Sequence, residues 1–201
     1  MATNFRSIAF GPAVLAAQQA AYGRTEAPPP IGEPDLLGED EKRFLESRDS
    51  FYLASVNADG WPYVQHRGGA PGFLRVLDAE RFAFPDYRGN RQLISVGNTS
   101  ENARVALILM DYPSRTRLKI LGEARTLTGA AAEPLLALWP EQKSIERVFE
   151  VRVHGFDWNC PKYITPRFTE AEVEDYVAPL RTRVQELERE LARLRKEKSE
   201  S

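Results

Sequence analysis

The chain has 201 residues, 42% of them hydrophobic, which is enough for one domain with a core and some additional segments. Its 27 basic and 29 acidic residues give a net charge of -2, which excludes a general basic field for nucleic acid. The single cysteine, Cys160, excludes an internal disulfide and a multi-cysteine metal site. We expect a cytoplasmic protein, because residues 1–24 make a poor signal peptide and no apolar run reaches the roughly 18 residues of a membrane span.

The first 39 residues predict an arm that precedes the main domain. Residues 11–22 are rich in alanine and glutamine and predict a short helix. The prolines between residues 28 and 34 then require an extended connector. A second helix is expected over residues 40–47, because the helix dipole favours acidic residues near the start of a helix and this segment has them there.

The central part of the chain predicts consecutive antiparallel strands. Short apolar, β-branched and aromatic runs alternate with turn signals such as Asn57-Ala58-Asp59-Gly60. A helix over residues 130–138 and a strand over residues 144–154 follow. Because no strand–helix–strand repeat is present, we expect a mainly β fold with helices, a small β-barrel, over residues 40–168. The other expected strands cover residues 51–56, 61–65, 72–77, 81–84, 104–110 and 118–127.

Residues 169–201 have the apolar spacing of a coiled coil. Steps of four and three residues alternate along this segment, and charged residues flank the apolar positions. Pro179 predicts that the regular helix begins near Leu180. This helix either pairs with another chain or folds back on its own domain. The apolar positions are Val173, Val177, Leu180, Val184, Leu187, Leu191 and Leu194.

The glycine-rich residues 66–74 are a candidate ligand site. Glycines let a ligand approach the backbone closely, and Phe73 together with Tyr87 could pack against a ring. The segment is neither a Rossmann fingerprint, since a strand pattern follows it, nor a P-loop, since it lacks the required lysine. The alternative is a plain bend between strands.

Residues 88–92 are a candidate phosphate site. Two arginines, an asparagine and a glutamine surround Gly89 here, and arginine forms charge-assisted hydrogen bonds with phosphate oxygens. The alternative is a solvated turn with surface arginines.

An aromatic segment, residues 158–164, comes just before the terminal helix. It either takes part in a site or ties that helix to the barrel, with Cys160 as a small buried residue. Nothing in the sequence pairs Cys160 with His66 or His154, so nucleophilic catalysis and metal binding are not expected.

Taken together, residues 60–69 with Pro71-Gly72-Phe73, residues 87–92 and residues 158–164 resemble the pyridoxamine 5'-phosphate oxidase-related FMN-binding family. The resemblance covers roughly residues 44–168 and implies a split β-barrel homodimer with FMN at the subunit interface. It implies that residues 67–74 line the flavin ring and ribityl chain, that residues 88–92 hold the phosphate, and that residues 158–163 approach from the partner chain. The implied cofactor-binding residues are Arg67, Gly68, Gly69, Pro71, Phe73, Leu74, Asp86, Tyr87, Arg88, Asn90, Arg91, Gln92, Trp158, Asn159, Cys160 and Lys162.

The chain departs from the vitamin B6 oxidases because it ends in the heptad segment and lacks their arginine-rich C-terminal substrate segment. The resemblance therefore implies an FMN-dependent oxidoreductase acting on a small molecule other than pyridoxamine phosphate, or exchanging hydride with a nicotinamide donor. The alternatives are a non-catalytic FMN-binding or sensor module and a binder of heme or another planar cofactor. No catalytic side chain is assigned; His66 is either a proton donor or a structural histidine.

Overall fold

The computed structural model describes residues 4–23, 26–140, 144–158 and 161–199. The chain divides into two compact units. Unit 1 comprises residues 1–111 and 116–162, and unit 2 comprises residues 112–115 and 163–201.

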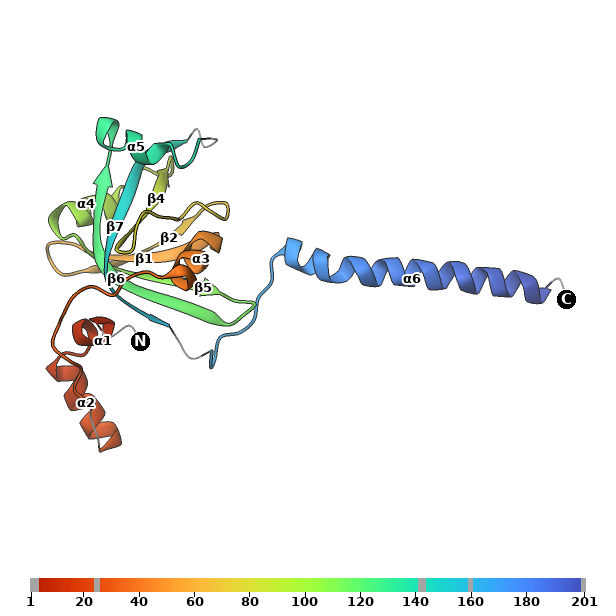
Figure 1. The fold of residues 1–201 in the computed structure, drawn as a ribbon, viewed down its shortest axis with the longest axis horizontal. Helices are drawn as coiled ribbons and strands as arrows, with labels where there is room; N and C mark the ends of the chain where they lie inside the picture. The colour runs from red at the N-terminus through yellow and green to blue at the C-terminus, as the bar shows by residue number, and fades with distance from the viewer. Residues whose placement is uncertain (1–3, 24–25, 141–143, 159–160, 200–201) are drawn as a thin grey trace. The chain divides into compact units, whose positions relative to one another are not determined.

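Unit 1 is built on one antiparallel sheet. Over its described residues seven strands follow the order β2-β1-β5-β6-β7-β4-β3 (Figure 1). The mainly β fold with helices is therefore confirmed. The strands are β1 Ser50–Val56, β2 Pro62–Gly68, β3 Arg75–Val76, β4 Arg81–Tyr87, β5 Arg104–Asp111, β6 Thr116–Leu127 and β7 Ile145–Trp158; the helices are α1 Asn4–Ala9, α2 Pro12–Tyr22, α3 Glu39–Ser47, α4 Ile94–Glu101, the short 3-10 turn Gly129–Ala131 and α5 Glu133–Leu136.

The first hairpin forms where the turn signal predicts it. β1 pairs with β2 in register from Ser50 opposite Gly68 to Val56 opposite Pro62. The turn closes because Asn57 Oδ1 accepts a hydrogen bond from the Trp61 amide at 2.8 Å, and Gly60 has a left-handed φ of 84° that glycine adopts readily.

The sheet curls so that strands distant in its order meet. β6 and β7 pair with a register shift between Leu121 and Gly122, and such an irregularity bends a strand and increases its twist. Gly122 is needed there, because a Cβ atom would lie 2.3 Å from the Arg152 carbonyl oxygen. The ring of Phe51 on β1 therefore reaches the ring of Phe84 on β4, with centroids 4.9 Å apart.

The core lies inside this curl and is dominated by phenylalanine. Phe51 stacks on Phe73 at 5.9 Å and Phe84 stacks on Phe149 at 5.1 Å, and all four side chains are 0 to 1% exposed. Aromatic pairs at these spacings stabilise a core beyond the area they bury.

Asp35 attaches the N-terminal arm to β7. Its carboxylate accepts hydrogen bonds from the amides of Asn4, Phe5 and Phe156, at 3.1 to 3.3 Å. Close contact between α1 and the strand requires Gly155, where a Cβ atom would meet the Phe5 nitrogen at 2.5 Å.

Three elements of unit 1 differ in extent from the prediction. The strand expected over residues 72–77 is only β3, because Gly72 turns the chain with a φ of 86°. The helix expected over residues 130–138 is a 3-10 turn followed by the four-residue α5, in which Pro134 occupies the first turn. β7 extends beyond residue 154 to Trp158.

Unit 2 contains the tip of the β5–β6 hairpin and the helix α6, Glu170–Ser199. The prediction that the helix begins near Leu180 is wrong, because it passes through Pro179 and begins at Glu170. A capping box explains the start: Thr169 Oγ1 accepts from the Glu172 amide, and the Glu172 carboxylate accepts from the Thr169 amide at 2.8 Å. Among the described residues no helix, α6 included, has the length and apolar character needed to cross a membrane.

Candidate functional site

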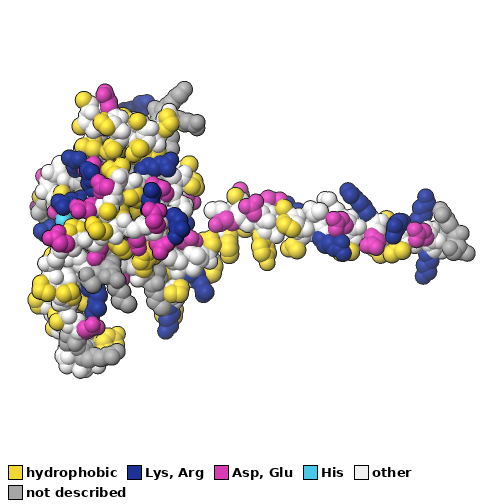
Figure 2. All heavy atoms as spheres, viewed as in Figure 1, with side chains coloured by type: hydrophobic (Ala, Val, Ile, Leu, Met, Phe, Trp, Pro, Cys, Tyr) yellow, Lys and Arg dark blue, Asp and Glu magenta, His cyan; other side chains and the backbone are white. Residues whose placement is uncertain are grey.

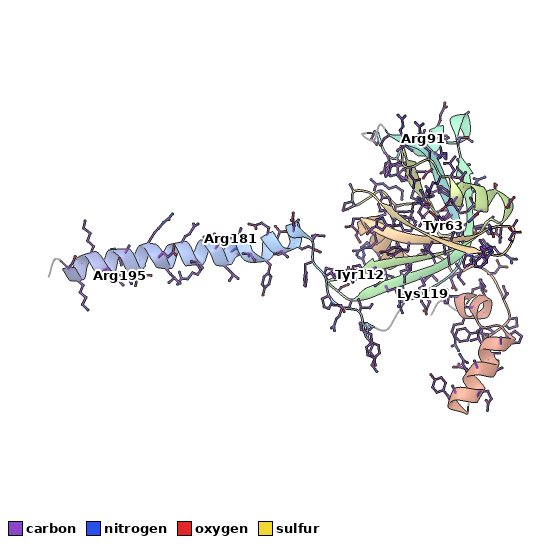
Figure 3. All side chains as sticks on the ribbon, turned by 180° about the vertical axis from the view of Figure 1, so that it is seen from behind. Tyr63, Arg91, Tyr112, Lys119, Arg181 and Arg195 are labelled. Atoms are coloured by element: carbon purple, nitrogen blue, oxygen red, sulfur yellow. The ribbon has the colours of Figure 1, made fainter. Side chains whose placement is uncertain are left out.

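A cleft of about 590 Å³, open to solvent, lies in unit 1 where β2, β4 and β7 meet the loop that leads into α4. This volume includes space open to solvent; the part that can be compared with other cavities is about 200 Å³, smaller than a typical small-molecule pocket. Figure 3 labels Arg91, which lies at the rim of this unit. The lining residues are Gln65, Arg67, Asp86, Tyr87, Gly89, Asn90, Arg91, Leu93, Ser95, Val96, Glu146 and Arg147.

The floor of the cleft is an ion-pair network centred on Asp86. Arg67 Nη1 donates to Asp86 Oδ1, and Arg147 Nη1 donates to Asp86 Oδ2 at 2.8 Å. These side chains are largely buried, with 12%, 7% and 17% of Arg67, Asp86 and Arg147 exposed. Asp86 is the carboxylate partner of Arg67 among the described residues, whereas Arg147 also pairs with Glu146 at 2.8 Å. The Asp86 carboxylate thus compensates the desolvated charge of Arg67 and shares that of Arg147 with Glu146.

One hydrogen-bond donor of Arg67 has no acceptor among the described residues. Its guanidinium lies 5.1 Å from the centre of the Phe149 ring, which supports it from below. Its Nε is buried and has no hydrogen-bond acceptor among the described residues. An orphaned buried donor beside a cleft is a group that a bound ligand can satisfy.

The loop of residues 88–93 forms one wall of the cleft and has unusual backbone geometry. Arg91 and Leu93 adopt left-handed φ angles of 60° and 56°, which cost free energy in residues other than glycine. The Asn90 side chain accepts the Gln92 amide at 3.2 Å, and every residue of the loop is exposed. Strained residues persist where the surrounding structure holds them, and they are frequent at ligand sites.

The arginines of the loop are freer to bind an anion than the arginines of the floor, which are held in ion pairs with Asp86. Arg91 makes no hydrogen bond or ion pair with any residue that the structure describes. Arg88 Nε lies 3.9 Å from Glu146 Oε1, a weak pair at an exposed site. The cationic group that can accept a new anion is therefore Arg91, with Arg88 beside it.

Polar contacts hold α4 against the strands that carry the cleft. Ser95 Oγ donates to Gln65 Oε1 at 2.8 Å, and Asn98 Nδ2 donates to Ser55 Oγ at 3.0 Å. These bonds position Gln65 and Ser95 at the cleft wall.

The structure brings five of the predicted site residues together: Arg67, Asp86, Tyr87, Asn90 and Arg91 all line the cleft. Arg88 and Gln92 lie in the same loop but are not among the lining residues. Sequence reasoning missed Gln65, Ser95, Glu146 and Arg147. In the sequence, Arg147 is simply a charged residue within a strand pattern. The importance of Arg147 follows from the pairing of β4 with β7, which places it opposite Asp86.

The glycine-rich segment behaves mainly as a tight turn. Gly68 ends β2, and a Cβ atom on Gly69 would lie 2.7 Å from Phe73 Cγ. Phe73 and Leu74 are 1% and 0% exposed, so their side chains belong to the core and only their backbone atoms could face a ligand. Pro71 is exposed next to them.

Of the predicted residues near the end of β7, Trp158 and Lys162 do not line the cleft within one chain. Trp158 Nε1 donates to Glu41 Oε1 at 2.7 Å, and its ring meets Phe44 edge-on at 4.8 Å. Lys162 is exposed, and Asn159 and Cys160 lie outside the described residues. His66 is exposed on β2 with its ring 5.5 Å from that of Tyr52, and it does not line the cleft.

Comparison with known proteins gives one family match. Residues 37–154 match the family model described as pyridoxamine 5'-phosphate oxidase. A search of curated protein sequences finds no match.

Solved structures share the fold at low sequence identity. HupZ from Group A Streptococcus superimposes with a TM-score of 0.51 at 15% identity, covering 66% of this chain and 100% of that one. A variant of the same protein gives 0.50 at 16% identity, covering 61% and 98%. An FMN-binding protein from Syntrophomonas wolfei gives 0.45 at 10% identity, covering 60% and 85%. The split-barrel arrangement expected from the sequence is confirmed.

Proposed function

The chain belongs to the pyridoxamine 5'-phosphate oxidase family, a family of flavin-binding oxidoreductases, and from this premise we propose that it binds FMN in the cleft of unit 1. The unpaired guanidinium of Arg91 carries the proposal. A phosphate needs charge-assisted donors, and Arg91 is a cationic lining residue that no described residue neutralises.

The donor set of the cleft suits the phosphate and ribityl part of FMN. Arg88, Asn90, Arg91 and Gln92 offer exposed donors on one loop, and the buried Nε of Arg67 lacks an acceptor among the described residues. The Asp86 carboxylate, which accepts hydrogen bonds only, holds Arg67 and Arg147 in place and does not bind the phosphate itself.

A second copy of the chain completes the proposed site. The cleft is open on one side. The segment that follows β7 in sequence contains Asn159, Cys160 and Lys162, and Lys162 is not among the residues that line the cleft of its own chain. In a homodimer with FMN at the interface, this segment of one protomer approaches the flavin held by the other.

The proposed activity is an FMN-dependent oxidoreduction of a small molecule other than pyridoxamine phosphate, with a nicotinamide as a candidate donor. Bound FMN supplies hydride acceptance and donation, and the protein supplies orientation and electrostatics.

Two measurements in sequence test the proposal. The purified protein is titrated with FMN while the visible spectrum is recorded, and saturable binding is expected. The complex is then mixed anaerobically with NADH or NADPH, and bleaching of the flavin band supports an oxidoreductase. If FMN binds but neither nicotinamide reduces it, the protein is an FMN-binding module and not an oxidoreductase. If FMN does not bind and added hemin gives a bound-heme spectrum, the proposal of a flavin site is overturned.

A further inference from the structure

The helix α6 exposes a continuous apolar stripe. Six apolar side chains of this 30-residue helix are 47 to 57% exposed, although they recur on one face. Figure 2 shows hydrophobic side chains along one edge of the helix, with acidic and basic side chains on the rest of the visible surface. The six are Val173, Leu180, Val184, Leu187, Leu191 and Leu194.

The residue types in the stripe indicate how many helices it suits. In heptad notation Val177, Val184 and Leu191 occupy position a, and position d is leucine in three of its four occurrences, Val173 being the exception. Among parallel coiled coils, valine at a with leucine at d favours two strands over three or four. Pro179 falls at position c, on the outer face, where it does not obstruct a partner.

The charges beside the stripe match those of a second copy. In a parallel pair, position g of one helix faces position e of the next heptad on the other. Arg183 then faces Glu188 of the second copy, and Glu190 faces Arg195, so both pairs have opposite charges.

These flanking residues are largely available for such pairing. Glu188, Glu190 and Arg195 make no ion pair with any residue that the structure describes, while Arg183 contacts Glu186 at 3.0 Å. Position f, Arg189, lies on the opposite face from the stripe and serves as a reference.

We propose that α6 forms a parallel two-stranded coiled coil with α6 of a second copy of this chain. The pairing covers the apolar stripe and is independent of whether unit 1 binds FMN.

Disulfide trapping in the full-length chain tests the pairing. In a Cys160→Ser background, Leu194→Cys places a thiol at position d, and Arg189→Cys places one at position f. Because paired d positions bring the two Cβ atoms to disulfide distance, Leu194→Cys should form linked dimers at least about tenfold faster than Arg189→Cys. Non-reducing gels measure the rate of linked-dimer formation, and circular dichroism checks that the two variants are equally helical. Equal rates at the two positions would overturn the pairing.

Orientation is tested by mixing two singly substituted chains. The thiols of Val177→Cys and Leu194→Cys face each other only if the two helices are antiparallel. The antiparallel arrangement is tested because it also brings opposite charges together beside the stripe. After unfolding and refolding together, the parallel arrangement predicts Val177–Val177 and Leu194–Leu194 linked dimers. A dominant mixed dimer, resolved by mass spectrometry, would contradict it.

Discussion

Asp86 lies directly opposite Arg147 in the antiparallel pairing of β4 with β7, and its Oδ2 accepts a hydrogen bond from Arg147 Nη1 at 2.8 Å. Its other oxygen accepts from Arg67, which comes from β2 near the opposite edge of the sheet. One carboxylate therefore links the two sides of the curled sheet at the floor of the cleft.

Asp86→Asn should destabilise unit 1 because it leaves the largely buried Arg67 guanidinium without a carboxylate among the described residues, while Arg147 keeps only its pair with Glu146. We expect a loss of about 2 to 4 kcal/mol in the free energy of unfolding, near the lower end for broken buried pairs. Urea unfolding followed by tryptophan fluorescence measures it.

Asp78→Asn is the matched control. Asp78 also pairs with an arginine, Arg81, but both side chains are more than 40% exposed. The hydrogen bond from Arg81 holds the pKa of the Asp78 carboxyl below its usual value, yet exposed pairs contribute at most about 1 kcal/mol. Equal losses for the two variants would show that the Asp86 network has no special structural role.

Gly69→Ala should destabilise the turn after β2, because the new Cβ would collide with the buried Phe73 ring. The expected cost is about 1 to 3 kcal/mol, typical of overpacking. Gly97→Ala is the contrast: nothing lies within 4 Å of that Cβ in α4, and alanine should stabilise the helix by up to about 1 kcal/mol. Thermal unfolding compares them, and an unchanged Gly69→Ala protein would contradict the packing explanation.

Trp158→Phe keeps an aromatic ring and removes the N–H that Glu41 accepts. We expect a stability loss of about 1 kcal/mol, the worth of one hydrogen bond. FMN affinity should remain within about twofold, since this N–H is engaged within its own chain. A large loss of FMN affinity with unchanged stability would mean that the indole N–H serves the cofactor directly.

Local signals account for what could be predicted of the fold. The Asn57–Gly60 turn and the alternating runs around it give the β1–β2 hairpin, because both depend on residues close in sequence. The start of α6 is harder to place, because Pro179 indicates a break while the cap between Thr169 and Glu172 sets the actual beginning.

The candidate site was only partly predictable for a different reason. Residues 86–91 are close in sequence, so their clustering could be seen directly. Arg147 and Glu146 reach the cleft through the pairing of β7 with β4, which joins residues some sixty positions apart. Their contribution depends on a register that local pattern does not specify.

The measurement that tests the phosphate site most directly is the FMN dissociation constant of Arg91→Ala beside that of Arg115→Ala. Both arginines are exposed and have left-handed φ angles, 60° and 56°, so the backbone cost of alanine is matched. Arg115 lies in the β5–β6 turn, outside the cleft.

Fluorescence titration should show FMN binding weakened by about 1.5 to 3 kcal/mol, roughly 10- to 150-fold, in Arg91→Ala. Arg115→Ala should bind FMN as the unsubstituted chain does. Equal affinity of Arg91→Ala and the unsubstituted chain would contradict the assignment of the phosphate to this loop.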